Sequence, residues 1–475
     1  MLKRISKESK SAFAYLISTV ISRGLSVITV PIFTRLMSTD QIGIVNIFNS
    51  WYSILSTIAS LGLLSGGLTM ALQQFKKNKD QYLSSALTLT SLSAVIFGIF
   101  YLLFHEQIDK IIDLPSSLII LMIFGFLVAP ARDFWLLRQR FEFKYKLSSI
   151  ITIASSVIAT VVSVGVVIYL SKLGMNDKLA EGRLWANYLV VFFIAAIIWI
   201  YIFLKGKTFY DHEYWSYSLR LSLPLLIYSL AAQILSVSDR IMIGKMIGNS
   251  AAGIYGTLYN VGTLSLMIWT AINGSYSPFL YQNLDSNRAH VKKVTKQILL
   301  LFAALSCLVS LLAPEIVRLL ATEEYYNAIY ILPPIAAGVF LTAASNIFSD
   351  ILVYVGKTKY IMYGGCISAA LNLLLNYFFI KEFGYMAAAF TTMISYIILT
   401  LLMAFWANYI FGRSNVNSAI GNKEMFYICL FSLCIMMLGL VLYKLYLVRY
   451  AITLIIGFVS WKYYKTFNNR ENELL

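Results

Sequence analysis

Long apolar segments recur along the whole chain, and they constrain its fold more than any other feature. A membrane-spanning helix needs about 20 mostly apolar residues, and about fourteen such segments can be marked. Only 13% of the 475 residues are charged, against roughly 25% in soluble chains. We therefore predict an all-α polytopic membrane protein with about fourteen transmembrane helices. The segments lie near 12–34, 42–66, 84–104, 116–137, 147–170, 184–204, 219–247, 252–272, 294–314, 328–355, 359–380, 384–408, 425–443 and 447–466.

The basic residues predict how these helices are oriented. The formal net charge is +16, and most Lys and Arg residues fall in alternate connectors, counted from the N-terminus. Cytoplasmic loops of membrane proteins carry such an excess. We therefore predict a multi-pass protein of the cell inner (cytoplasmic) membrane with both termini in the cytoplasm. Because this rule accounts for the positive charge, we expect no nucleic-acid partner.

Two pairs of similar segments indicate an internal repeat. Residues 35–44 resemble residues 245–254, and residues 144–146 resemble residues 357–359 at nearly the same offset. Each repeat would hold six helices, and an even number gives both copies the same orientation in the membrane. The predicted parts are an N-terminal six-helix lobe (1–210), a C-terminal six-helix lobe (211–412), and two additional transmembrane helices with a cytoplasmic tail (413–475).

Polar side chains follow single faces of the first, second, seventh and, more weakly, eighth predicted helices. Their spacings of three and four residues place them along one side of each helix. The alternatives are a polar cavity between the helices or ordinary helix packing, where serine and threonine are common. Those that we predict to line a cavity are Ser22, Ser26, Asn49, Ser53, Gln233 and Asn260.

Three arginines fall inside predicted spans, namely Arg23, Arg132 and Arg240. A charge within the bilayer costs about 2.5–3.5 kcal/mol on insertion scales, so it faces a bundle interior or water. Two of these arginines have an acidic residue beside them in the sequence, in Arg132–Asp133 and Asp239–Arg240. Adjacent residues of a helix point about 100° apart, so we expect neither neighbouring pair to form a ready ion pair. The alternatives are an interhelical pair of Arg23 with Asp239, or a water-filled cavity that offers positive charge to an anion such as phosphate. Arg35 and Lys245 would stand at the outer mouth of that cavity.

Further polar groups lie in the later spans. Asp350, Asn372 and Asn376, with Asp239, are candidates for a coupling-ion site or an ion pair. Interhelical hydrogen bonding is the other interpretation. The four cysteines have no ligand spacing and the three histidines lie in separate connectors, so we expect no metal site, and the chain shows no sign of a cofactor.

The sequence also resembles a known family, the polysaccharide-repeat flippases (Wzx type) of the multidrug/oligosaccharidyl-lipid/polysaccharide exporter superfamily. The resemblance implies a V-shaped cavity lined by the first, second, seventh and eighth helices. It implies a transporter that moves undecaprenyl-diphosphate-linked oligosaccharides across the inner membrane by alternating access, for O-antigen (lipopolysaccharide), capsule or another polysaccharide. Its partners would be this glycolipid, membrane lipids, a polysaccharide polymerase and a chain-length regulator. The segments that carry it are 31–43, 238–245, 277–281, 372–376, 383–384 and 387–389.

Two other functions compete with this interpretation. A multidrug or metabolite antiporter of the same superfamily would favour acidic cavity residues for organic cations, whereas the predicted stripes carry arginine. A membrane glycosyltransferase would be expected to show an acidic pair in an outer loop, and a polymerase a large outer loop. The sequence shows neither of these features. We therefore predict a transporter rather than an enzyme, with the cations binding the diphosphate.

Overall fold

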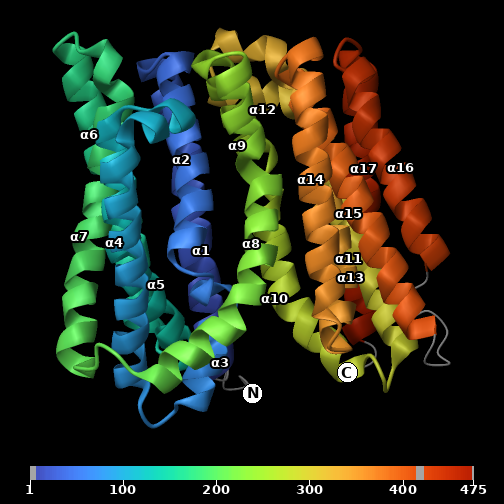
Figure 1. Cartoon of the computed structure of the whole chain (residues 1–475). Coiled ribbons are helices and arrows are strands. Elements are labelled where there is room, and N and C mark those ends of the chain that lie inside the picture. The colour runs from blue at the N-terminus through green and yellow to red at the C-terminus, as the bar shows by residue number, and fades with distance from the viewer. Residues whose placement is uncertain (1–6, 413–421, 473–475) are drawn as a thin grey trace. The chain divides into compact units, whose positions relative to one another are not determined.

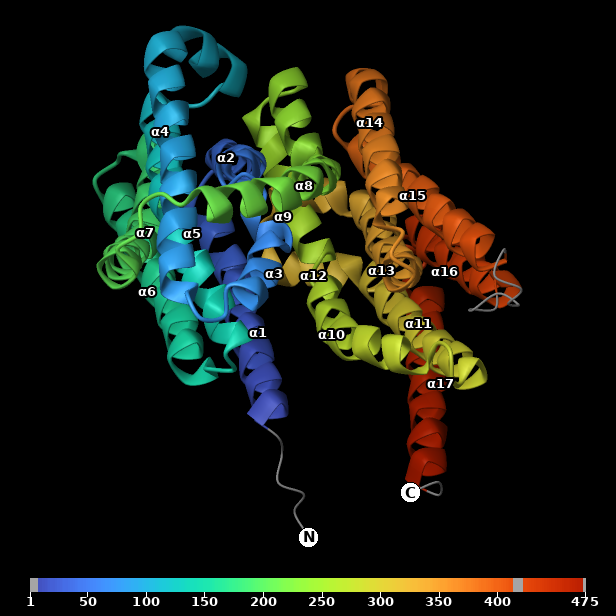
Figure 2. The ribbon, with the colours of Figure 1, turned by 60° about the horizontal axis from the view of Figure 1, so that its bottom comes forward.

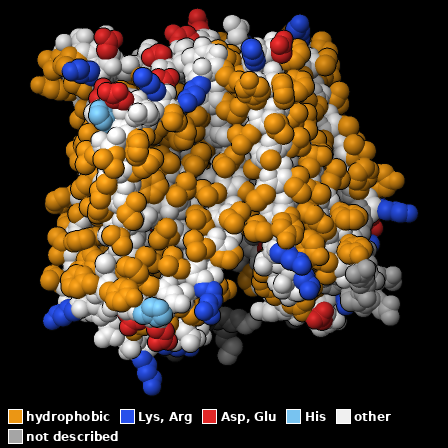
Figure 3. All heavy atoms as spheres, in the orientation of Figure 1, with side chains coloured by type: hydrophobic (Ala, Val, Ile, Leu, Met, Phe, Trp, Pro, Cys, Tyr) orange, Lys and Arg blue, Asp and Glu red, His pale blue; other side chains and the backbone are white. Residues whose placement is uncertain are grey.

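The computed structural model describes residues 7–412 and 422–472. Within these ranges the chain folds into seventeen α-helices and three short 3-10 helices, with no strand. Twelve of the described helices are long and apolar enough to cross a membrane. On the face in Figure 3, hydrophobic side chains cover the length of the helices, and charged side chains gather toward their ends. The predicted all-α polytopic class is confirmed.

The predicted eighth segment, 252–272, is divided in the structure. Helix α9 (Asn249–Gly262) ends and α10 (Ser265–Asn283) begins within it. At the break, the amides of Leu264 and Leu266 bond to carbonyls three residues earlier, at 3.2 and 3.0 Å. Such tighter turns interrupt a regular α-helix. This segment and the fourteenth, which becomes α17, are the two predicted spans that are not among the twelve.

The contacts divide the chain into two compact units, residues 1–253 and 254–475, and each is described by itself. The lobe boundaries that we predicted at residues 210 and 412 divide the chain by its internal repeat, whereas these units are defined by their contacts. Those boundaries therefore stay a prediction. The helices of unit 1 are α1 (Lys7–Leu36), α2 (Thr39–Ala59), η1 (Leu63–Ser65), α3 (Gly67–Gln74), α4 (Lys79–Ile112), α5 (Ser116–Phe141), α6 (Tyr145–Lys172), η2 (Asn176–Lys178), α7 (Leu179–Gly206), α8 (His212–Met246) and the first residues of α9.

An aromatic and aliphatic cluster fixes the start of α8 in unit 1. Tyr214 is buried there against residues of η1, α3, α4, α5 and α7. One turn later, the hydroxyls of Tyr82 and Ser218 lie 2.9 Å apart. Pro224 follows inside the helix, and prolines commonly kink helices. Figures 1 and 2 show the first turns of α8 beside α3 and its later turns rising along α2.

The two segments that are similar in sequence cross each other closely in unit 1. A Cβ atom on Gly43 of α2 would lie 1.8 Å from the carbonyl oxygen of Asn249, and one on Gly253 would lie 2.0 Å from that of Thr39. The hydroxyls of Thr39 and Ser250 are 2.7 Å apart. In the repeat, Thr39 corresponds to Asn249 and Gly43 to Gly253, so the contact is reciprocal, as at a two-fold axis. Only glycine lets the two backbones approach this closely.

Unit 2 is built around α13, whose candidate span is 83% buried. Helices α11, α14, α15 and α16 pack against it. Most residues of α13 are apolar, as expected for a helix that is largely covered by its neighbours. The elements of unit 2 are the remainder of α9, α10, α11 (Arg288–Leu311), α12 (Ala313–Leu320), η3 (Glu323–Ile331), α13 (Leu332–Tyr354), α14 (Thr358–Phe383), α15 (Met386–Gly412), α16 (Asn422–Leu442) and α17 (Tyr446–Asn472).

Candidate functional site

A cavity of about 380 Å³ lies within unit 1, where α2, η1, α5 and α8 meet. Its size falls toward the lower end of the roughly 300–1,000 Å³ typical of small-molecule sites. Most of the lining side chains are small, hydroxylated or aromatic. They are Tyr52, Ser56, Thr57, Ser60, Leu64, Ser65, Gly125, Phe126, Ala129, Pro130, Asp133, Tyr228, Ser229, Ala232 and Gln233.

One hydrogen bond joins the polar faces predicted on the second and seventh helices, and another joins the seventh helix to η1. The Ser53 hydroxyl of α2 donates to Oε1 of Gln233 on α8 at 2.8 Å. The Ser229 hydroxyl of α8 donates to the hydroxyl of Ser65 in η1 at 2.6 Å. The structure therefore brings these two stripes together at the cavity, although their role in binding a substrate stays a prediction.

An aromatic cluster forms the wall behind the cavity. The Tyr52 ring stacks on Phe126 with 5.6 Å between ring centroids, and it meets Tyr188 edge to face at 5.2 Å. The Tyr188 hydroxyl donates to Oδ1 of Asn49 at 2.9 Å. Asn49, predicted to line the cavity, therefore supports the wall and is not one of the lining residues. Gly125 makes room for the cluster, because a Cβ there would lie 2.4 Å from the Phe192 ring.

Asp133 is the sole charged side chain among the residues that line the cavity. Its Oδ1 atom lies 3.5 Å from a terminal nitrogen of Arg132, and both side chains are partly exposed, at 38% and 29%. We expected no ready ion pair between these neighbours, and that expectation was wrong. The long arginine side chain spans the angle between the two positions on the helix. Asp133 belongs to no polar spacing pattern that could have marked it as a cavity residue.

The predicted cations are not among the described residues that line the cavity, although Arg132 contacts the lining residue Asp133. Arg240 is buried with 7% of its surface exposed, and its backbone amide donates to Oδ1 of Asp239 at 2.8 Å. Arg35 and Lys245 are exposed, and a guanidinium nitrogen of Arg35 donates to the Pro31 carbonyl at 2.8 Å. The side chain of Arg23 is outside the described residues, so its predicted pair with Asp239 stays a prediction.

The other predicted polar residues have varied surroundings. The Ser22 hydroxyl accepts from Ser156 of α6 at 3.0 Å, and Ser26 is exposed on α1. Asn260 is exposed on the part of α9 that belongs to unit 2. The structure does not bring Ser22 or Ser26 into the cavity lining.

The intramembrane polar groups of unit 2 bond to neighbouring helices. Oδ2 of Asp350 on α13 accepts from the Ser277 hydroxyl of α10 at 2.6 Å. Asn372 of α14 donates to Thr392 of α15 at 3.1 Å, and Asn376 of α14 accepts from the Thr391 hydroxyl of α15. Both asparagines are fully buried. These contacts are the interhelical hydrogen bonds that formed one of our two interpretations, and a coupling-ion role stays a prediction. Across the described part of the chain, no three His, Cys, Asp or Glu side chains gather as a metal site would require.

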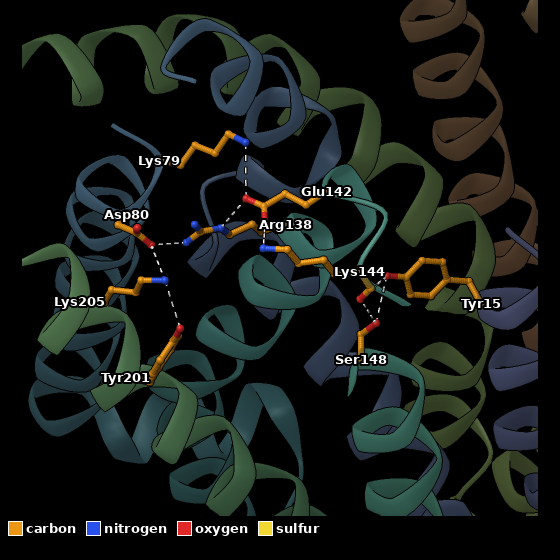
Figure 4. Close-up of polar contacts among 9 residues, drawn as sticks. All are labelled: Tyr15, Lys79, Asp80, Arg138, Glu142, Lys144, Ser148, Tyr201 and Lys205. Carbon is orange, nitrogen blue, oxygen red and sulfur yellow. Dashed lines mark hydrogen bonds and ion pairs between the residues drawn. The ribbon is translucent and has the colours of Figure 1, made fainter. Parts of the chain in front are cut away.

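A charge network that sequence reasoning missed joins the ends of α4, α5 and α7 to the α5–α6 connector. It consists of Lys79, Asp80, Arg138, Glu142, Lys144 and Lys205, and Figure 4 shows its members pointing toward one another. Arg138 bonds to Asp80 and, through Nε at 3.1 Å, to Glu142. The network lies at the helix ends that we predict to be cytoplasmic.

Glu142 is the most strongly coupled carboxylate of this network. Its Oε2 atom lies 2.7 Å from Nζ of Lys144, and its Oε1 atom lies 3.4 Å from Nζ of Lys79. Burial alone would raise the pKa of the Glu142 carboxyl, but the hydrogen bonds and positive charge of Lys144 and Arg138 lower that pKa to about 2. The carboxylate is therefore ionised at any physiological pH.

Sequence comparisons match two protein families and a curated relative. The profile of the polysaccharide biosynthesis protein family matches residues 9–284, and the MatE profile matches residues 224–378. One curated relative is the probable low-salt glycan biosynthesis flippase Agl15 of Haloferax volcanii. It is 22% identical over 414 residues, which cover 83% of this chain and 82% of the relative.

Solved structures of similar fold include three transporters. The lipid II flippase MurJ, in an inward closed conformation, matches with a TM-score of 0.68 and 18% identity over 96% of this chain and 98% of its own. An inward-facing MATE multidrug transporter matches with a TM-score of 0.59 and 14% identity, over 83% of this chain and 94% of its own. A MOP superfamily transporter of Pyrococcus furiosus matches with a TM-score of 0.54 and 14% identity, over 87% of this chain and 98% of its own. The likeness to these structures is one of fold. The names of these relatives describe flippases and transporters rather than enzymes.

Proposed function

The chain belongs to the polysaccharide biosynthesis protein family, and from this premise we propose that it is a flippase for lipid-linked oligosaccharides. The substrate would be a polysaccharide repeat unit on undecaprenyl diphosphate, which the protein moves across the inner membrane by alternating access. Both termini would lie in the cytoplasm. Two similar proteins carry names of this kind, a glycan biosynthesis flippase and a lipid II flippase.

The observation that carries this proposal is the polar cavity inside a unit built of membrane-spanning helices. Hydroxyl and amide groups of α2, η1 and α8 line the cavity. Polar groups inside a membrane protein mark a substrate path by default. A glycan headgroup needs such a path, because its hydroxyls cannot cross the hydrocarbon core without hydrogen-bond partners.

We assign the diphosphate to the cations, as the sequence predicted, with Arg23 and Arg240 central and Arg132, Arg35 and Lys245 along the path. A guanidinium group suits a phosphate because its planar fork makes two charge-assisted bonds at once. Arg132 lies next to the cavity through its contact with Asp133. The diphosphate would therefore sit beside the sugars, with the lipid tail left in the bilayer.

Complementation of surface-polysaccharide export in a strain without its own flippase tests the arginine assignment. Replacing Arg23 or Arg240 by Ala should weaken substrate binding by about 10- to 150-fold, because each removes a charge-assisted hydrogen bond. The Lys variants should keep part of the function. Arg220→Ala is the matched control, since Arg220 is an exposed arginine of α8 outside the proposed path. Full export by both Ala variants, at normal membrane protein levels, would refute the diphosphate role.

The same experiment separates the alternative ion pair. If Arg23 pairs with Asp239, removing one partner leaves a buried charge and lowers the protein level, while removing both restores it. Asp239 is buried in unit 1, so leaving its charge unpaired should lower the protein level by a measurable amount. Rescue of the protein level by Arg23→Ala together with Asp239→Ala would therefore support the pair in place of the substrate role.

A second candidate function is a multidrug or metabolite antiporter. Two observations favour it: the MatE profile matches residues 224–378, and the cavity holds the carboxylate of Asp133. An acidic cavity residue would attract an organic cation. Ethidium accumulation in cells distinguishes the two functions, because an antiporter lowers it, whereas a glycolipid flippase leaves it unchanged while restoring export.

A further inference from the structure

The cavity of unit 1 carries little net charge despite its carboxylate. Asp133 is the sole charged side chain among its lining residues, and the Arg132 guanidinium lies 3.5 Å from it. At this distance the two opposite charges largely cancel for a ligand in the cavity. An organic cation would compete with the Arg132 guanidinium for the Asp133 carboxylate, and an anion would be repelled by that carboxylate. The charge therefore favours a neutral ligand.

The lining offers the groups that a sugar ring requires. A carboxylate accepts hydrogen bonds from hydroxyl donors, and serine hydroxyls and the Gln233 amide both donate and accept. Tyr228 also lines the cavity, and aromatic side chains pack well against the apolar face of a sugar ring. We propose that this cavity is a saccharide subsite, which binds uncharged sugar residues next to the diphosphate of the glycolipid. This inference rests on the proposed flippase function.

The polar groups of the subsite are oriented before a ligand arrives. Gln233 is held by Ser53 at 2.8 Å, Ser229 by Ser65 at 2.6 Å, and Asp133 by Arg132. Each contact limits the rotamers of a lining side chain. Groups that are ordered in advance lose less entropy on binding, which increases affinity for a ligand of matching shape.

The subsite discriminates between classes of sugar. A neutral hexose or N-acetylhexosamine presents hydroxyl donors to Asp133 and no charge. A uronic acid would place a second carboxylate near Asp133, and two like charges that lie close together repel each other. The cavity therefore selects neutral over acidic sugars at the position that it contacts.

Binding of three glycolipids to the purified full-length protein tests this inference by native mass spectrometry. The probes are undecaprenyl diphosphate without sugar, the same lipid with one N-acetylglucosamine, and the same lipid with one glucuronic acid. We expect the N-acetylglucosamine lipid to bind about tenfold more tightly than the sugar-free lipid, because hydrogen bonds to a charged group are strong. The glucuronic acid lipid should bind no more tightly than the sugar-free lipid.

Two variants and one control locate the effect in the cavity. Asp133→Asn should abolish the advantage of the N-acetylglucosamine lipid over the sugar-free lipid. The readout is the ratio of the two affinities, because an Arg132 side chain released from Asp133 would strengthen diphosphate binding in both lipids alike. Ala232→Leu should do the same by narrowing the cavity, and because Ala232 is exposed it should not disturb the fold. Asp40→Asn is the control, since Asp40 is an exposed carboxylate at the start of α2 outside the cavity.

The outcomes separate this inference from the function on which it rests. Equal binding of sugar-free and N-acetylglucosamine lipids by the unmodified protein would refute the subsite and leave the flippase function standing. Equal weakening of both lipids by Asp133→Asn would also refute the subsite. If Asp133→Asn left binding unchanged but altered the Na⁺ or pH dependence of transport, Asp133 would be a coupling site instead. If none of the three lipids bound, the proposed function itself would fail.

Discussion

Glu142 connects three helix ends through a single carboxylate. It accepts from Lys79, Arg138 and Lys144, so Glu142→Gln leaves three cations with a weaker acceptor. Because the site is partly solvated, we expect this variant to lose about 1–2 kcal/mol of its free energy of unfolding. Each kcal/mol lowers the melting temperature by roughly 2–4 °C. Thermal unfolding in detergent at pH 7 measures this. Glu106→Gln is the control, since Glu106 is exposed on α4.

The effect of Glu142 should depend on pH in a defined direction. The folded protein lowers the pKa of this carboxyl from 4.5 to about 2. Its stabilisation is therefore complete above about pH 4.5 and is lost as the pH falls toward 2. The difference in melting temperature between the unmodified protein and Glu142→Gln should be largest at neutral pH and shrink across that window. A difference that stayed constant from pH 7 to 3 would contradict the ion network.

Some site residues were predictable from spacing and others were not. Ser53 and Gln233 follow helical periodicity, and the structure brings them within 2.8 Å. The contact of Arg132 with Asp133 was missed because it depends on how a long side chain bends, which spacing does not encode. Arg138 and Asp80 are 58 positions apart, and only the packing of α4 against α5 joins them. Contacts of that kind require the tertiary arrangement.

The glycine crossing of α2 and α9 gives a prediction about helix packing. Gly253→Ala would place a Cβ atom 2.0 Å from the Thr39 carbonyl oxygen, so the two helices must move apart. Overpacking of this kind costs about 1–3 kcal/mol. Gly165→Ala on α6 is the control, because nothing lies within 4 Å of a Cβ atom there, and it should be neutral or slightly stabilising. Equal melting temperatures for the two variants would contradict the crossing.

The fold class was predictable because long apolar segments encode membrane helices directly, and twelve of the described helices meet that criterion. The interruption between α9 and α10 was less visible, because residues 252–272 are apolar enough to be marked as one span. The start of α8 was also misjudged. Tyr214 lies in the buried cluster, five positions before the predicted span begins at 219, because aromatic residues of polar connectors can still pack in a core.

The orientation of the whole chain is testable with reporter fusions. The predicted topology places fusions after Lys79 and Lys359 in the cytoplasm and a fusion after Lys110 in the periplasm. Lys79 begins α4 and Lys110 lies in its last turn, so the two reporters sit at opposite ends of one helix. The bias of basic residues is the physical reason for this orientation. A periplasmic signal after Lys79 or Lys359 would overturn it.

Transport by the purified protein tests the proposed flippase function most directly. The protein would be reconstituted in vesicles that contain undecaprenyl-diphosphate-linked N-acetylglucosamine with a fluorescent label, and the fraction accessible to an external quencher would be followed with time. We predict movement between leaflets well above that of protein-free vesicles, reduced about tenfold or more by Arg240→Ala. A rate equal to that of protein-free vesicles, in a preparation that takes up ethidium, would contradict the flippase function and favour the antiporter.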